Sequence, residues 1–176
     1  ALDAVLPFTD LVLYDLKEID PDRHRVFTGR SNASILANLL AIRSRMAAGG
    51  PPHELWIRTP VIPDATATDA NIAGIGQWLA DHLGRTVARW ELCAFNNLCR
   101  DKYQRLDCDW PFERHPLLSE AKMEHLADIA RRSGVDPDIV HSSGSTRLSS
   151  EIIHEKQDLS QQATSASHPP QGERHP

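Results

Sequence analysis

Apolar residues along this chain fall into two kinds of pattern, and the two kinds alternate. Compact apolar runs at 11–16, 54–59 and 87–95 have strand character, and each is followed by a segment in which apolar residues recur every three or four positions. The second pattern is typical of a helix that buries one face. Strands that alternate with helices predict an α/β fold built on a parallel sheet.

Capping residues predict where the first two helices begin and end. Asp20, which precedes a proline, predicts a helix start, and Gly29 predicts the end of that helix. A longer helix follows Ser31 or Asn32 and stops at the Gly-Gly-Pro-Pro sequence at 49–52. The inward face of this second helix is expected to carry Ile35, Leu39, Ile42 and Met46.

The second half of the chain predicts two further helices and a short strand. One helix follows Thr68 or Asp69 and ends before Gly84, and the other runs from Ser119 to Ser133-Gly134. Pro60 is expected to close the strand at 54–59. The prolines in residues 96–118 argue against a long helix there, and residues 139–142 are expected to add a short strand.

Composition divides the chain into a domain at 1–150 and a tail at 151–176. The tail is rich in Gln, Ser, Ala, His and Pro, so it cannot bury enough apolar surface to offset its ordering entropy, and we expect it to be disordered. Because the chain opens on Ala1 with what looks like the end of a helix, we interpret it as a fragment. The strand at 11–16 would then be a bare apolar edge, which predicts poor solubility or marginal stability unless another segment covers it.

Charge and hydropathy limit the partners and the compartment. The net charge of −5, with no basic stripe and interleaved aromatics, gives no reason to expect a nucleic acid partner. No apolar run approaches the roughly 18 residues of a membrane helix and no signal peptide is recognisable, so we expect no membrane association and a cytoplasmic location. Three cysteines, Cys93, Cys99 and Cys108, are too few and too unevenly spaced for a disulfide framework.

Polar residues stand where the three main strands are expected to end. Asp15 and Lys17 point to the same side of an extended strand about 6–7 Å apart, which suits a small zwitterion. Arg58 nearly ends the second strand, and Asn96 follows the third. Because ligands gather at the carboxyl ends of parallel strands, these side chains are expected to converge on one rim.

Simpler interpretations of the same residues stay open. Asp15 and Lys17 also fit an ordinary surface ion pair. Arg58 also fits a role in neutralising a glutamate of the sheet, either Glu54 or Glu91. An asparagine directly after a strand is also typical of a loop in which the side chain satisfies its own backbone.

Several short motifs occur in a fixed order around these residues. They are Tyr14-Asp15-Leu16-Lys17, then Asp20-Pro21, His24, Thr28-Gly29 and Asn32, then the segments 56–63 and 91–98, and finally Lys102-Tyr103. In this order, over roughly residues 5–145, the chain resembles the activating enzymes of glycyl radical enzymes, a group of the radical S-adenosylmethionine superfamily that includes pyruvate formate-lyase activating enzyme. The resemblance implies the C-terminal part of a partial (β/α) barrel, whereas the residues alone leave an open doubly wound sheet as an alternative.

The resemblance also implies roles for five residues in binding S-adenosylmethionine. Lys17 would hold its ribose or amino-acid portion, and Leu16 would touch it through backbone or side chain. Asp15 would support the site, for example by binding a monovalent cation. Arg58 would lie near the sulfonium and the carboxylate. Asn96 stands where many relatives have a histidine close to the adenine, and an amide can also donate to and accept from an adenine edge.

The cofactors and partners that the family implies extend beyond this chain. The parent protein would cleave S-adenosylmethionine at a [4Fe–4S] cluster to a 5′-deoxyadenosyl radical, take hydrogen from a glycine of a glycyl radical enzyme, and receive electrons from a donor such as flavodoxin or ferredoxin. The CxxxCxxC loop that holds the cluster in the superfamily is not present in this sequence. We therefore expect the chain alone to be inactive.

Two other functions remain as alternatives to an activating enzyme. The first is a non-catalytic remnant that acts as a binding or docking module and keeps only the surface that faces a partner. The second is an unrelated α/β barrel enzyme that binds a phosphate or a nucleotide at the same rim, although the chain has no glycine-rich phosphate loop.

Overall fold

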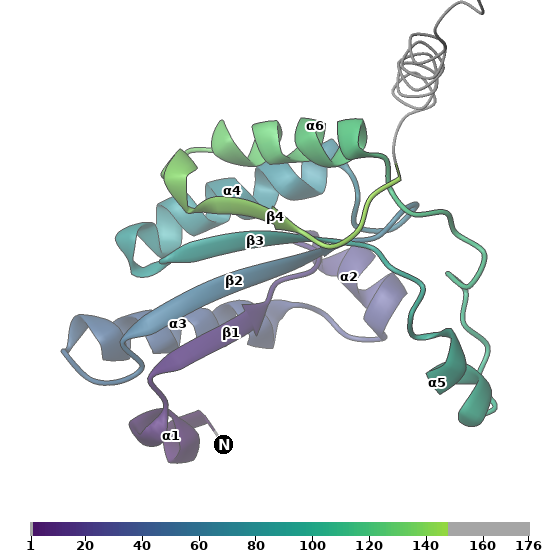
Figure 1. The fold of residues 1–176 in the computed structure, drawn as a ribbon. Coiled ribbons are helices and arrows are strands. Elements are labelled where there is room, and N and C mark those ends of the chain that lie inside the picture. Colours follow the sequence, from purple (N-terminus) through teal and green to yellow (C-terminus); the bar gives the residue numbers. More distant parts are fainter. Residues whose placement is uncertain (1, 148–176) are drawn as a thin grey trace, which may run out of the picture.

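A single sheet of four parallel strands organises the chain in the computed structural model, which describes residues 2–147. The strands lie in the order β1-β2-β3-β4, which is also their order along the sequence. Their bounds are β1 Leu11–Asp15, β2 Glu54–Val61, β3 Arg89–Ala94 and β4 Val140–Ser143. The predicted α/β fold with parallel strands is confirmed (Figure 1), and the predicted tail at 151–176 lies outside the described residues.

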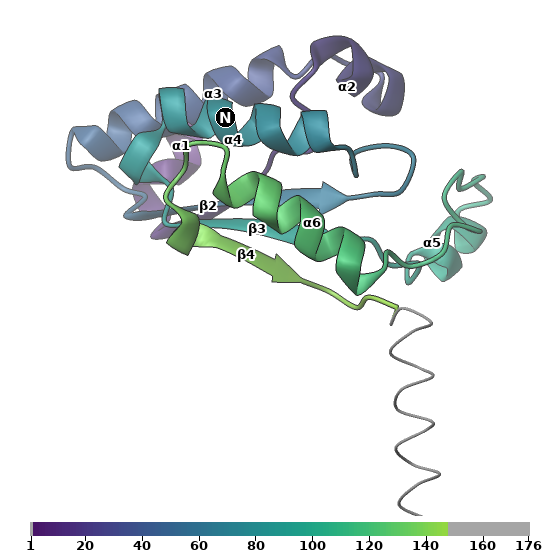
Figure 2. The same ribbon diagram turned by 90° about the horizontal axis from the view of Figure 1, so that it is seen from above.

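The helices follow the strands as the sequence predicts. Their bounds are α1 Leu2–Val5, α2 Pro21–Thr28, α3 Ala33–Ala47, α4 Asp69–His82, α5 Arg100–Arg105 and α6 Glu120–Arg131. Helices α3, α4 and α6 pack against one face of the sheet, where their apolar side chains join those of the strands in one core (Figures 1 and 2). Trp90 of β3 is fully buried in this core and is its largest side chain.

Most of the predicted caps form the expected hydrogen bonds. The Asp20 carboxylate accepts from the backbone nitrogens of the first turn of α2, and Gly29 ends that helix with a φ of 77°. Thr68 and Ser119 accept in the same way at the starts of α4 and α6. Asn32 precedes α3 without capping it, because its side chain donates instead to the carbonyl oxygens of the loop after β1.

Strand β2 runs through Pro60, two residues further than predicted. The carbonyl of Arg58 accepts from Leu16 on the β1 side, whereas the carbonyl of Val61 accepts from Phe95 on the β3 side. Backbone groups of a strand alternate in direction, so Pro60 faces the β1 side at a point where β1 has already ended. A proline without an N–H costs the sheet no hydrogen bond at such a position.

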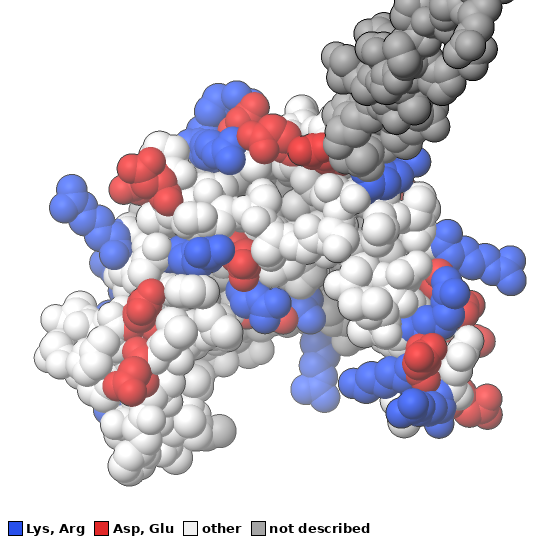
Figure 3. Space-filling model, viewed as in Figure 1, with Lys and Arg blue, Asp and Glu red and all other residues white. Residues whose placement is uncertain are grey.

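The two faces of the sheet differ sharply in burial. Along β2 and β3 every second residue is buried under the helices, and the residues between them are only partly buried. Together with the exposed residues of β1, the second set forms what we call the open face of the sheet: Leu11, Leu13, Asp15, Glu54, Trp56, Arg58, Pro60, Arg89, Glu91 and Cys93. Figure 3 looks onto this face and shows basic and acidic side chains next to one another across its middle.

Strand β1 lies at the edge of the sheet and pairs only with β2 among residues 2–147. Leu13 on the open face of β1 is 51% exposed, and Leu11 is 39% exposed. The arrangement is the exposed apolar edge that the sequence predicted. The expected poor solubility of the chain alone stays a prediction.

Candidate ligand site at the carboxyl ends of the strands

Three charged residues form a row across the open face. Asp15, Arg58 and Glu91 are register partners on β1, β2 and β3, and side chains of neighbouring strands in such a row lie about 5 Å apart. The Nε atom of Arg58 lies 3.6 Å from a carboxylate oxygen of Glu91. The pKa of Arg58 is raised, first by the neighbouring Cys93 sulfur and further by the charges of Asp15 and Glu91.

Lys17 extends this row toward the rim. Its Nζ atom lies 3.7 Å from Asp15, and the two side chains are both close to half exposed. The contact fits the ordinary ion pair left open by the sequence, and an exposed pair of this kind contributes at most about 1 kcal/mol. The structure therefore brings Asp15, Lys17 and Arg58 together, with positive and negative groups side by side.

Leu16 lies between these charged residues but faces the other way. Its side chain is fully buried in the core. Its N–H donates to the Arg58 carbonyl at 2.9 Å, and its carbonyl accepts from the Thr59 hydroxyl at 2.9 Å. The same hydroxyl accepts from the indole nitrogen of Trp90 at 3.0 Å. Leu16 thus anchors the end of β1 to β2 and β3 and leaves only its backbone near the open face.

Buried amide groups hold the loop that carries Lys17. Asn71, 2% exposed in the first turn of α4, donates to the carbonyls of Lys17 and Thr66 and accepts from the N–H of Ile19. Asn32 donates to the carbonyl of the same Ile19. Sequence reasoning missed Asn71, because its contacts with Ile19 and Lys17 lie 52 and 54 residues away along the chain and leave no local signal.

Replacing Asn71 by leucine is expected to lower the free energy of unfolding by about 2–4 kcal/mol, since one buried and two partly buried backbone groups lose their partners. Chemical denaturation measures the change. Gln77, an exposed amide on the same helix, provides the matched control, and its replacement by leucine should cost less than about 0.5 kcal/mol. Equal losses in the two variants would contradict the anchoring role of Asn71.

Asn96 lies at the end of β3 and is exposed. Its side-chain oxygen accepts from the N–H of Leu98 at 3.2 Å, which is the loop-forming arrangement left open by the sequence. Among the described residues, no hydrogen bond or ion pair joins Asn96 to Lys17 or Arg58. A role of Asn96 toward adenine stays a prediction.

The segment after β3 packs back onto itself beside the rim. Trp110 stacks on Tyr103 with 5.3 Å between ring centroids and also contacts Phe95 at the end of β3. His115 lies 3.1 Å from the carboxylate of Asp64 in the loop after β2. The short helix α5 lies in this segment, so the predicted absence of a long helix agrees with the structure.

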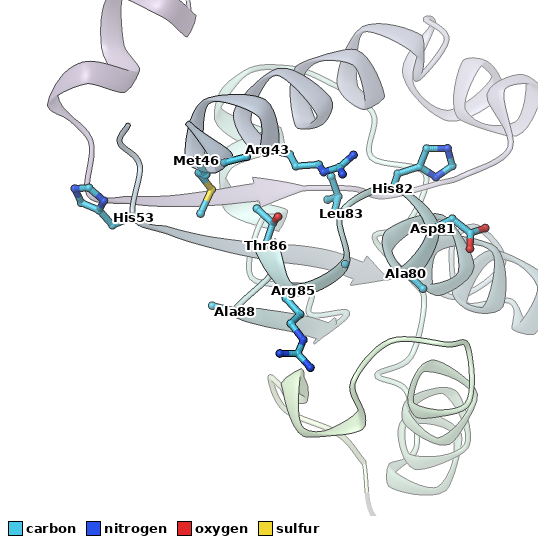
Figure 4. Close-up of a pocket in the computed structure, with 12 residues that line it drawn as sticks. Arg43, Met46, His53, Ala80, Asp81, His82, Leu83, Arg85, Thr86 and Ala88 are labelled. Carbon is cyan, nitrogen blue, oxygen red and sulfur yellow. The ribbon is translucent and has the colours of Figure 1, made fainter. Parts of the chain in front are cut away.

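A hollow lies at the other end of the sheet (Figure 4). It measures about 680 Å³ and is lined by the ends of α3 and α4 and by residues just before β2 and β3, among them Arg43, His53 and Arg85. In Figure 4 the two arginines point to different sides of this hollow. The amino ends of parallel strands serve stability rather than ligand binding, so the charged row remains the candidate site.

Residues 2–147 offer neither a metal site nor a membrane-spanning helix. Within that part of the chain no group of three His, Cys, Asp or Glu residues is placed to hold a metal ion. Cys99 and Cys108 are exposed, and Cys93 is partly buried. None of the described helices is both long enough and apolar enough to cross a membrane.

Similarity to known proteins points to one group of enzymes. The chain is 36% identical over 134 residues to the indoleacetate decarboxylase activating enzyme of Tractidigestivibacter scatoligenes, a match that covers 76% of this chain and 40% of the relative. It is 36% identical over 128 residues to the isethionate sulfite-lyase activating enzyme of Nitratidesulfovibrio vulgaris, covering 73% of this chain and 39% of the relative. The chain thus spans about two fifths of the length of these curated relatives, and no family model matches it.

A solved structure shares the fold. A domain of the pyruvate-formate lyase-activating enzyme of Bacteroides vulgatus superposes with a TM-score of 0.58 at 23% sequence identity. The superposition covers 81% of this chain and 73% of that domain. At 23% identity this likeness shows the fold alone, which is a partial barrel.

Proposed function

The chain belongs to the family of glycyl radical enzyme activating enzymes in the radical S-adenosylmethionine superfamily, and we propose that its open sheet face forms the nucleoside side of an S-adenosylmethionine site. The observation that carries this proposal is the row of Asp15, Arg58 and Glu91 with Lys17 beside it. The relatives are named as activating enzymes, and the whole protein would likewise activate a glycyl radical enzyme.

The charges of this row suit the ligand. S-adenosylmethionine carries a carboxylate, an ammonium group and a sulfonium, so a site for it needs both signs of charge within a few ångströms. Arg58 is 42% exposed and approaches Glu91 most closely through Nε, so its terminal nitrogens remain for a carboxylate, which a guanidinium can bind with two parallel hydrogen bonds. Lys17 adds a second cation, and Asp15 offers oxygens to an ammonium group or a monovalent cation.

Leu16 and Asn96 would support the site in different ways. Leu16 fixes the end of β1 through its backbone bonds to Arg58 and Thr59, so that Asp15 and Lys17 on either side keep their orientation. Asn96 would approach the adenine after its loop rearranges, because its oxygen is engaged with Leu98. The chemistry that S-adenosylmethionine supplies in this family is a radical that removes hydrogen from a glycine of the partner.

The [4Fe–4S] cluster does not fit the described residues. Cys93 lies on the sheet near Arg58, while Cys99 and Cys108 stand six and fifteen positions further along, and the residues at 2–147 hold no group suited to a metal. We propose that the ligands of the cluster belong to another part of the parent protein. The same parent protein would accept electrons from a cytoplasmic donor, a flavodoxin or ferredoxin.

The loop after β2 is the proposed contact for the glycine-bearing segment of the partner. Residues 60–68 stand at the carboxyl end of the sheet beside the candidate site. The loop is tied to the rest of the rim through Asp64 and His115. We propose this contact from position alone.

Binding of S-adenosylmethionine by the whole gene product that contains this chain tests the proposed function. In anaerobic equilibrium dialysis, Lys17→Ala is expected to raise the dissociation constant about tenfold, because a charge-assisted contact is lost. Lys122→Ala, which removes a lysine on helix α6 away from the open face, should leave binding unchanged. No binding by the unaltered protein, or equal effects of the two changes, would overturn the proposal.

A further inference from the structure

Glu91 is the one acidic residue of the open face that lies between two arginines. A carboxylate oxygen of Glu91 is 3.6 Å from Arg58 on β2, and the other is 3.3 Å from Arg89 two residues earlier on its own strand. Its side chain is only 16% exposed, and the guanidinium of Arg89 lies over the Trp56 ring. The sequence offered Glu91 as one of two glutamates that Arg58 could neutralise, and the structure gives Glu91 two cationic partners.

The balance of charge at the rim depends on this one carboxylate. Around Glu91, the residues Lys17, Arg58 and Arg89 carry three positive charges and Asp15 and Glu91 carry two negative charges, while Glu54 lies at the far end of β2. Removing the charge of Glu91 would leave a net excess of two positive charges among these five residues. Because Glu91 is largely shielded from water, its charge acts on the site with less screening than the half-exposed Asp15 does.

We propose that Glu91 determines the specificity of the site for a sulfonium over the neutral thioether of the same nucleoside. This inference rests on the proposed function. A sulfonium is a permanent cation, so it is repelled by a site with excess positive charge and is accepted when Glu91 offsets the arginines. Arg58 binds the carboxylate, a group that the sulfonium and the thioether ligands have in common.

Two ligands separate this role from a merely structural one. S-adenosylhomocysteine has the adenine, ribose, ammonium and carboxylate of S-adenosylmethionine but lacks the methyl group and the positive charge. If Glu91 only holds Arg58 in place, its loss weakens the binding of both ligands alike. If Glu91 offsets positive charge, its loss weakens the binding of the sulfonium more than the binding of the thioether.

The test compares dissociation constants of both ligands for the whole gene product, measured anaerobically by isothermal titration calorimetry. In Glu91→Gln the preference for S-adenosylmethionine over S-adenosylhomocysteine should fall about three- to tenfold. Because the preference is a ratio within one variant, a partly misfolded sample lowers both signals and leaves the ratio intact. Glu91→Asp, which keeps the charge, should retain most of the preference.

A second variant moves the preference in the opposite direction. Arg89→Gln removes a positive charge from the same open face and should raise the preference for the sulfonium about two- to fivefold. Glu54→Gln is the matched control, since Glu54 lies on the same face of β2 at the far end of the strand and its carboxylate accepts from the Trp56 indole. Its ratio should equal that of the unaltered protein.

The outcomes distinguish the inference from the function on which it rests. An unchanged ratio in both Glu91→Gln and Arg89→Gln, with binding intact, overturns the role of Glu91 and leaves the proposed function standing. Binding of neither ligand by the unaltered protein overturns both. Opposite shifts of the ratio in the two variants support the inference.

Discussion

Arg58→Ala is expected to weaken binding of S-adenosylmethionine about 10- to 100-fold, because the ligand loses its charge-assisted hydrogen bonds to the guanidinium. The change also leaves Glu91, 16% exposed, with Arg89 as its remaining cationic partner. Equilibrium dialysis with the whole gene product measures the loss.

Arg58→Lys should retain only a small part of the affinity for S-adenosylmethionine, since an ammonium group cannot bind a carboxylate through two parallel hydrogen bonds. The control is Arg43→Ala, which removes an arginine from the hollow at the opposite end of the sheet. Full affinity in Arg58→Ala, or an equal loss in Arg43→Ala, would show that the ligand does not meet the charged row.

Thr59→Val is expected to lower the free energy of unfolding by about 2–4 kcal/mol. The hydroxyl of this fully buried residue joins three strands, since it donates to the Leu16 carbonyl and accepts from the Trp90 indole nitrogen. Valine has nearly the same shape and leaves both of these groups buried without a partner. Thr59→Ser keeps the hydroxyl and should cost clearly less.

A double-mutant cycle isolates the contact with Trp90. In a chain that already carries Trp90→Phe the indole donor is gone, so Thr59→Val should cost about 1 kcal/mol less than it does alone. Urea denaturation supplies all four free energies. Equal costs in the two backgrounds would show that the Thr59–Trp90 hydrogen bond contributes nothing to stability.

Local signals in the sequence were enough for the order and type of the main elements. The caps at Asp20, Thr68 and Ser119 and the glycine at position 29 act through neighbours within a few residues, so they can be recognised without knowledge of the fold. Parallel pairing followed from the alternation of strands and helices. The proposed rim followed from the rule that the carboxyl ends of parallel strands share an edge.

The register of the strands could not be predicted, and the charged row depends on it. Pairing of Asp15 with Arg58 and of Arg58 with Glu91 fixes which charges meet, and a slip of one residue would turn Arg58 toward the core. Register is set by packing across the whole sheet, which no short motif encodes. The sequence therefore offered Glu54 and Glu91 as equal partners for Arg58, and only the structure selects Glu91.

Long-range hydrogen bonds were the other feature that the sequence did not reveal. Asn71 reads as an ordinary residue in the first turn of a helix, yet it holds the loop that carries Lys17. The extension of β2 through Pro60 depends in the same way on where the neighbouring strand ends.

Protection of Cys93 from alkylation tests the central claim most directly. Cys93 lies on the open face next to Arg58, whereas Cys99 and Cys108 are exposed in the segment that follows and serve as internal references. Mass spectrometry of the whole gene product after a timed iodoacetamide pulse reports each cysteine separately. We predict that S-adenosylmethionine slows alkylation of Cys93 several-fold and leaves Cys99 and Cys108 unchanged; alkylation of Cys93 at the same rate with saturating ligand would contradict a binding site on this face.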